Sequence, residues 1–175
     1  DPAALIEALG EHALVSEERA GGDGGAQVLT HAGIRLDLRI VQEDNFGDLL
    51  QHFTGSAAHN VQLRERALGR GLSVSEHGVA ETEGKKVHRF TDEAGVYELL
   101  GLPYIEPELR EGRGEIEAGD SGELPELVRI EDIRGDLHSH TTLSDGRNSL
   151  EEMAQGARGR RYAYFAITDH SASHG

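Results

Sequence analysis

Residues 52–64 read His52-Phe53-Thr54-Gly55-Ser56-Ala57-Ala58-His59-Asn60-Val61-Gln62-Leu63-Arg64. The stretch joins two segments in which apolar residues recur with helical spacing, at 45–51 and 57–70. Ser56 is a suitable N-cap for the second helix, and Gly71 is a suitable stop. We therefore predict two helices that meet at a tight glycine turn.

The residues before this corner predict a short helix and a small sheet. Helical spacing covers 2–12, and strand-like runs cover 13–17, 26–31 and 34–41. The run Gly-Gly-Asp-Gly-Gly over 21–25 predicts a flexible turn or a disordered tip. The third run is the clearest strand, because its apolar residues alternate with charged ones. One face carries Ile34, Leu36, Leu38 and Ile40, and the other carries Arg35, Asp37 and Arg39.

The residues after the corner change character twice. Strands are expected at 72–76 and 86–90, forming a hairpin around a charged loop, and a short helix is expected at 92–100. From 101 to 133 prolines, glycines and glutamates dominate, which predicts an extended surface connection and a domain boundary.

The last part of the chain has the pattern of a βαβ unit. A strand is expected at 134–138, a helix at 149–161 and a second strand at 163–168. Parallel strands joined by a crossover have their C-terminal ends at one edge of the sheet. The residues that follow the two strands should therefore lie close together.

Imidazole and carboxylate side chains occupy this edge. His138 and His140 are two residues apart and point the same way in a strand, Asp145 lies in the loop that follows, and His170 ends the second strand. This donor set suits Zn²⁺, Mn²⁺ or iron. The alternative is that these are unrelated surface histidines.

The run from His138 to Gly146, together with Ile167-Thr168-Asp169-His170, resembles the first two motifs of the polymerase-and-histidinol-phosphatase (PHP) family. That family hydrolyses phosphoesters in an irregular α/β barrel that holds several metals. The resemblance implies that His138, His140, Asp145 and His170 are ligands of Mn²⁺ or Zn²⁺, and that Asp169 orients a ligand. Further ligands of that family would follow Gly175, so an intact multinuclear site is not expected here.

The corner at 52–64 resembles the segment in which palm meets thumb in family X DNA polymerases, where Tyr-Phe-Thr-Gly-Ser is followed by an Asn. Leu36-Asp37-Leu38-Arg39 resembles the strand that carries the third catalytic aspartate of that family. Residues 72–102 resemble the rest of the thumb. Residues 103–111 and 124–128 resemble the connection to the PHP domain in bacterial and archaeal members.

The second resemblance implies roles for single residues. Asp37 would be a catalytic ligand of Mg²⁺, with Arg39 restraining the carboxylates. A glycine turn lets the backbone and an aromatic edge approach the sugar of an incoming nucleotide. Contacts with the nucleotide or DNA are expected from Arg39, His52, Phe53, Gly55, Ser56, Asn60 and Arg64, and the last two share a helix face.

Taken without the resemblance, these residues allow a simpler interpretation. Asp37 could be a solvated strand residue paired with its arginine neighbours, and the corner could be a helix cap with a buried Phe53. Two departures from the family stand out. His52 replaces the family's Tyr, and the paired aspartates of its Asp-x-Asp strand would precede Asp1. We expect the chain to start and stop within a longer protein and not to polymerise DNA by itself.

Composition limits the partners. Acidic residues outnumber basic ones by 32 to 17, for a net charge of −15. Because DNA-binding modules carry a basic face, this balance argues against tight DNA binding by the chain alone and favours bound cations or an acidic surface. There is no cysteine, which fits a reducing cytoplasm, and no apolar run of the length of a membrane span.

The sequence thus predicts an α+β chain in consecutive parts. These are the end of an antiparallel polymerase palm sheet over 1–44, an α/β thumb over 45–102, an interdomain linker over 103–133, and the first βαβ unit of an incomplete PHP α/β barrel over 134–175.

The expected function is that of a monomeric, cytoplasmic DNA-directed DNA polymerase of family X. It would fill short gaps in DNA with dNTPs during repair and carry a metal-dependent 3′-5′ exonuclease or phosphoesterase PHP domain. Two alternatives stay open. One is a stand-alone PHP-type phosphoesterase with an unrelated N-terminal domain, and the other is a non-enzymatic module that docks DNA or a repair partner.

Overall fold

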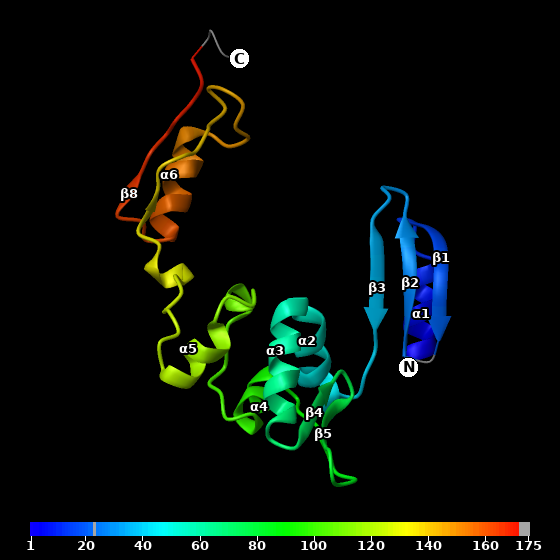
Figure 1. Cartoon of the computed structure of the whole chain (residues 1–175). Coiled ribbons are helices and arrows are strands. Elements are labelled where there is room, and N and C mark those ends of the chain that lie inside the picture. The colour runs from blue at the N-terminus through cyan, green and yellow to red at the C-terminus, as the bar shows by residue number, and fades with distance from the viewer. Residues whose placement is uncertain (23, 172–175) are drawn as a thin grey trace. The chain divides into compact units, whose positions relative to one another are not determined.

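The computed structural model describes residues 1–22 and 24–171 (Figure 1). The chain forms two compact units, Asp1–Leu124 and Pro125–Gly175. The first unit contains two antiparallel sheets with helices beside them, and the second contains one short parallel sheet with one α-helix.

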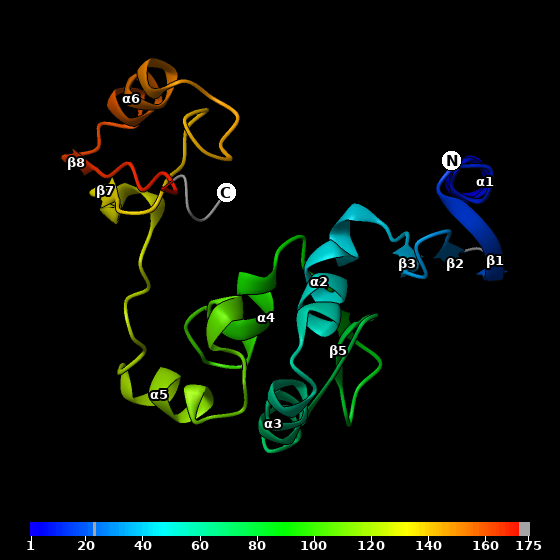
Figure 2. The ribbon, with the colours of Figure 1, turned by 90° about the horizontal axis from the view of Figure 1, so that it is seen from above.

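The N-terminal part of the first unit is a three-stranded antiparallel sheet with a helix against it. Strands β1, β2 and β3 follow one another in chain order, and α1 lies against β1 and β2, as Figure 2 shows from above. Ala26 and Val28 of β2 are buried, whereas Leu36 of β3 is largely exposed. The elements are α1 (Pro2–Gly10), β1 (Val15–Gly22), β2 (Gly25–Thr30) and β3 (Arg35–Arg39).

The glycine-rich run between β1 and β2 differs from its prediction. Gly21 and Gly22 belong to β1, and Gly25 belongs to β2, where it pairs with Arg39. Strand β1 is therefore longer than expected, and it pairs with β2 through two register shifts. Asp23, also part of the predicted tip, lies outside the described residues.

The predicted helical corner is present. A short 3₁₀ turn (Glu43–Asn45) leads into α2 (Phe46–Thr54), and α3 (Ala57–Leu68) follows after the cis peptide bond between Gly55 and Ser56. The hydroxyl of Ser56 caps α3, because it accepts a hydrogen bond of 3.3 Å from the main-chain N–H of His59. The capping residue was thus correctly predicted from the sequence.

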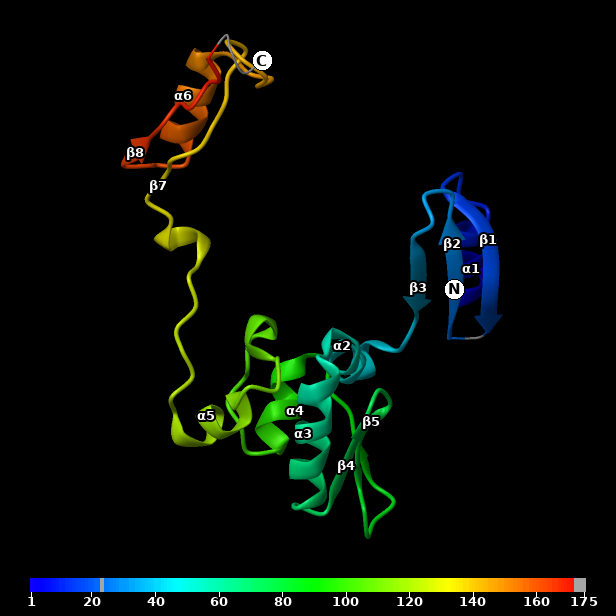
Figure 3. The same cartoon turned by 45° about the horizontal axis from the view of Figure 1, so that its top comes forward.

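The hairpin after α3 is not the predicted one. Strand β4 (Leu72–Ser75) pairs with β5 (Gly78–Glu81), and β6 (Val87–His88) pairs with β5 rather than with β4. The prediction missed β5 because its residues, Gly-Val-Ala-Glu, are few and begin with glycine. Helix α4 (Glu93–Leu99) follows, capped by Asp92. Figure 3 shows α3 beside β4.

The segment that was expected to be an extended linker contributes to the core of the first unit. It contains a 3₁₀ turn (Pro107–Leu109) and α5 (Glu115–Ser121), and it buries Ile105 and Ile116. The first compact unit extends to Leu124, inside the segment 103–133 that was expected to be a linker. The polar composition of this segment hides a few apolar anchors. The core consists of Leu63, Ala67, Val74, Val79, Val96, Tyr97, Leu100, Leu102, Ile105 and Ile116.

The second unit has the predicted βαβ order. Strands β7 (Gly135–Asp136) and β8 (Tyr164–Phe165) pair in parallel, and α6 (Leu150–Gly159) connects them. Both strands are shorter than expected. A 3₁₀ turn (Ile130–Asp132) precedes β7.

The described residues of this second unit bury little apolar surface, and Ala157 is their only buried apolar side chain. Ser149 and Glu152 form a capping box that starts α6. Local capping therefore helps to define where α6 begins.

Within the described ranges, no helix combines the length and the apolar character that crossing a bilayer requires.

Candidate functional site

Asp37 lies at the centre of a polar group on β3. Its carboxylate accepts hydrogen bonds from Gln27 Nε2 (2.9 Å) and from Arg39 (3.0 Å to a terminal nitrogen), and Arg39 Nε lies 2.8 Å from its second oxygen. The hydrogen bond from Arg39 and, to a lesser degree, that from Gln27 lower the pKa of Asp37. The carboxylate is therefore ionised at neutral pH, and Arg39 restrains it.

Asp37 and Arg39 border a cavity of about 550 Å³. The guanidinium of Arg39 lies 5.3 Å from the ring centroid of Phe53, so that β3 and α2 meet there. The volume is in the range of small-molecule sites, roughly 300–1,000 Å³. The lining includes several glycines, which leave room for close approach of a ligand. The described lining is Gly21, Gly22, Gly24, Gly25, Ala26, Gln27, Asp37, Arg39, Ile40, Val41, Leu49, Phe53, Glu76 and His77.

His52 connects the residues that were predicted to contact a nucleotide. Its carbonyl accepts a hydrogen bond of 2.8 Å from the Asn60 side chain, and its Nδ1 lies 3.4 Å from Arg64. Its ring meets Phe53 edge-on, with the centroids 5.1 Å apart. Phe53 is 51% exposed, so the buried Phe53 of the simpler interpretation is wrong, whereas its helix cap is present at Ser56. The corner thus presents an aromatic edge and a cation to solvent.

Asn60, which was expected to contact the nucleotide or DNA, lies inside the junction of the two helices. Its side chain is mostly buried, and its oxygen accepts a hydrogen bond of 2.8 Å from Gln51 Nε2. Together with the bond to His52, this ties the start of α3 to α2. Arg64 is exposed, one turn further along α3. The structure therefore separates a junction residue, Asn60, from a surface residue, Arg64.

Gln51 was missed in the sequence. It is buried, and the signal that could have identified it is a polar residue on the apolar side of a helical pattern.

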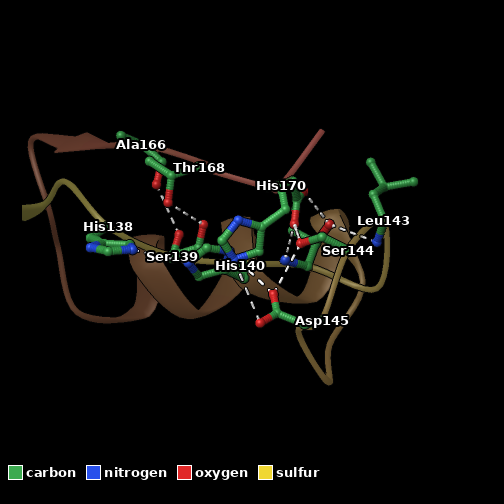
Figure 4. Close-up of polar contacts among 11 residues, drawn as sticks. His138, Ser139, His140, Leu143, Ser144, Asp145, Ala166, Thr168 and His170 are labelled. Atoms are coloured by element: carbon green, nitrogen blue, oxygen red, sulfur yellow. Dashed lines mark hydrogen bonds and ion pairs between the residues drawn. The ribbon is translucent and has the colours of Figure 1, made fainter. Parts of the chain in front are cut away.

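In the second unit, three of the four predicted metal ligands converge (Figure 4). The ligand atoms of His140, Asp145 and His170 all lie within 4.8 Å of one another. His140 Nδ1 is 3.3 Å and His170 Nε2 is 3.7 Å from the Asp145 carboxylate. His138 lies outside this group, but its Nε2 is 3.0 Å from Nε2 of His140.

Asp169 stabilises the loop that carries Asp145. Its carboxylate accepts hydrogen bonds of 2.6 Å from the main-chain N–H of Thr141, from the Thr141 hydroxyl and from the Ser144 hydroxyl. These bonds, that of Ser144 first, lower the pKa of Asp169. Asp169 therefore acts on the candidate ligand Asp145 through the loop rather than by direct contact with an imidazole.

The donor set of this cluster fits a divalent cation. Two imidazoles and a carboxylate suit Zn²⁺, Mn²⁺ or iron. In addition, His140 Nδ1 is buried and makes no hydrogen bond, although the Asp145 carboxylate lies 3.3 Å away, and a nitrogen free of hydrogen bonds is expected of a metal ligand. Asp37 has no such set around it. In the part of the chain that the structure describes, no group of three ligand-type side chains includes Asp37.

The chain is similar to known DNA polymerases. The family model of the DNA polymerase beta thumb matches residues 49–111. A curated relative from Bacillus subtilis (strain 168), "DNA polymerase/3′-5′ exonuclease PolX", is 42% identical over 173 residues, which cover 97% of this chain and 30% of the relative. DNA polymerase lambda of Rattus norvegicus is 30% identical over 128 residues, covering 61% of this chain and 22% of that relative.

A solved structure has a similar fold. The crystal structure of Leishmania infantum polymerase beta in a ternary P/T complex matches with a TM-score of 0.51 and 21% identity, over 62% of this chain and 51% of that one. At this identity the match supports the fold alone. The chain spans less than a third of the length of either curated relative. The thumb match and the similarity to the Bacillus relative over nearly the whole chain show that this chain belongs to the bacterial family X DNA polymerases.

Proposed function

We propose that the protein containing this chain fills short gaps in DNA by adding dNTPs to a 3′ end. In this proposal Asp37 is a catalytic ligand of Mg²⁺, with Arg39 holding its carboxylate, and His52, Phe53, Gly55, Ser56, Asn60 and Arg64 form the nucleotide and DNA side of the site. The observation that carries it is the joint position of Asp37, Arg39 and Phe53 on one cavity. A bound divalent cation supplies Lewis-acid stabilisation of the phosphates.

The residues of this chain have distinct tasks in that proposal. Arg39 keeps Asp37 ionised and oriented by two contacts, so that the carboxylate needs little reorganisation. Phe53 offers an exposed aromatic edge to the sugar. Gly55 has no side chain, so the turn next to Phe53 stays open to the nucleotide. Asn60 holds the two helices together, and Arg64 offers a cation to the template side. The other carboxylates of a two-metal site would come from outside the described residues.

For the second unit we propose metal-dependent hydrolysis of phosphoesters at DNA 3′ ends. His140, Asp145 and His170 would hold Mn²⁺ or Zn²⁺, with His138 next to them. The convergence of these side chains supports it, as does the word exonuclease in the name of the Bacillus relative. In this proposal residues 1–44 are the palm end, the thumb extends to about 124, and the second unit starts a PHP domain. The protein is proposed to act as a cytoplasmic monomer.

The test compares three variants of the full-length protein on a primed, gapped duplex with dNTPs and Mg²⁺ or Mn²⁺. Asp37→Ala should lower gap filling on the order of a thousandfold and leave 3′ hydrolysis intact. His170→Ala should lower 3′ hydrolysis and leave gap filling intact. Asp44→Ala, which removes an exposed carboxylate from the same unit, is the matched control and should change neither activity.

Other results would favour the alternatives. Phosphoester hydrolysis without gap filling in the wild type would favour a stand-alone phosphoesterase. Salt-dependent DNA binding without either activity would favour a docking module.

A further inference from the structure

Two polar side-chain pairs join α5 to the two ends of α3. Glu115, at the start of α5, lies 2.7 Å from Nδ1 of His59 in the first turn of α3. Asp120, near the end of α5, lies 2.5 and 2.7 Å from the guanidinium of Arg66 in the last turn of α3. Only the first of these pairs lies beside the glycine corner, because Ser56 caps the same turn that contains His59.

The pair at the corner belongs to a buried network. Glu115 also accepts hydrogen bonds from the main-chain N–H groups of Gly112 (2.8 Å) and Arg113 (2.7 Å). Nε2 of His59 lies 2.9 Å from the hydroxyl of Tyr97. A carboxylate can only accept, so we assign the proton of His59 to Nδ1, and Nε2 then accepts from Tyr97. All polar atoms of the imidazole are thereby satisfied, and its orientation is fixed.

The segment before α5 reaches the corner through the main chain as well. The N–H of Ser56 donates a hydrogen bond of 3.0 Å to the carbonyl of Arg110. Gly112 packs so closely on Ala58 that an added Cβ would lie 2.7 Å from that methyl group. Contacts at Ser56, Ala58 and His59 therefore hold the first turn of α3 against this segment.

We propose that His59 and Glu115 are positioning residues for binding of the incoming nucleotide. By fixing the first turn of α3, they fix the direction in which the helix leaves the corner and thus the place of Arg64 relative to Phe53. The inference rests on the proposed polymerase function. Neither residue touches the nucleotide, and their effect passes through Ser56 and Asn60. Displacements on the order of 1 Å at such a site can change rates by up to about a hundredfold.

The test is steady-state gap filling by the full-length protein, with KM for the dNTP and kcat measured separately. Glu115→Ala should raise KM roughly tenfold with a small change in kcat, because nucleotide binding is lost before the chemical step. His59→Phe, which keeps the ring volume and removes both hydrogen bonds, should raise KM in the same direction. It provides a second measurement in case Glu115→Ala folds poorly.

Two controls separate positioning from general stability. Asp120→Ala removes the other pair between α5 and α3, and Ile116→Ala removes a core side chain next to Glu115. Both should lower Tm, and both should leave KM within about twofold of the wild type when all variants are assayed equally far below their Tm.

The outcomes are distinguishable. If KM rises equally in Ile116→Ala and Glu115→Ala, or does not rise in Glu115→Ala and His59→Phe, the network is merely structural and the inference is wrong. If the wild type itself does not extend a gapped primer, the proposed function is wrong instead.

Discussion

The main-chain N–H of Ser56 donates a hydrogen bond to the main-chain carbonyl of Arg110, at 3.0 Å. Ser56 caps the helix that follows the glycine corner, and Arg110 lies in the segment whose composition predicts a linker. The guanidinium of Arg110 is buried against Glu93 and lies over the rings of Tyr97 and Tyr104. A candidate nucleotide-binding turn is therefore held by residues far along the chain.

Gly112→Ala should destabilise the first unit more than Gly122→Ala. Both glycines have a positive φ, +68° and +74°, so alanine costs about 1–2 kcal/mol of left-handed strain at either position. Gly122 has open space for a Cβ, whereas at Gly112 the Cβ would collide with Ala58. Urea unfolding of both variants measures the difference, which we expect to be about 1–3 kcal/mol. Equal losses in the two variants would contradict the close contact between Gly112 and Ala58.

Arg110→Ala should be among the most destabilising single substitutions in the thumb. The side chain is fully buried, and its removal leaves the mostly buried Glu93 without its ion-pair partner. Loss of one member of a buried pair costs about 3–5 kcal/mol. Asp120→Ala, which breaks a solvent-exposed ion pair, should cost much less, because water screens that pair. Denaturant titration measures both losses, and a similar small loss in both variants would show that Arg110 is not essential to the fold.

The stability of the first unit should fall as the pH drops below about 6.5. Burial lowers the pKa of His59 from its usual 6.5, in spite of the facing Glu115. Since the unfolded chain then binds the proton more readily, the contribution of neutral His59 is complete above pH 6.5 and is lost as the pH falls through the lowered pKa.

His59→Phe should reduce this slope, which for one proton is at most about 1.4 kcal/mol per pH unit. Glu115 contributes little to the slope from pH 7.5 to 6, because burial, which raises its pKa, is outweighed by the bonds from His59 and the main chain, which hold that pKa below 4.5. The measurement is the free energy of unfolding against pH.

Asp169→Asn should weaken metal binding by the second unit. The substitution replaces an acceptor oxygen that holds the loop at Thr141 and Ser144, and this loop carries Asp145. Loss of such an orienting group costs about 10–100-fold in metal affinity. Calorimetric titration of the full-length protein with Mn²⁺ gives the affinity. Glu152→Gln is the control. It changes the capping box of α6 and should leave the Mn²⁺ affinity unaltered. Unchanged Mn²⁺ affinity in Asp169→Asn would show that the loop held by Asp169 does not orient Asp145 for metal binding.

The sequence by itself determined the elements that depend on near neighbours. The alternation of residues 34–41 indicated β3, and the N-cap Ser56 indicated the start of α3. The order strand, helix, strand at the end of the chain indicated the parallel pair β7 and β8. These features follow from side-chain periodicity and capping, which act within a few residues.

Only the tertiary structure decided which charged residues are buried and what partners they have. Glu115 and Arg110 stand in a stretch that has the composition of a solvated linker, yet both are buried, because Glu115 accepts a hydrogen bond from His59 and Arg110 forms an ion pair with Glu93. The same holds for Asn60, whose side chain bonds to Gln51 and to the His52 carbonyl. A polar side chain can be buried only where partners satisfy it, and those partners come together through long-range closure of the chain, which periodicity does not encode.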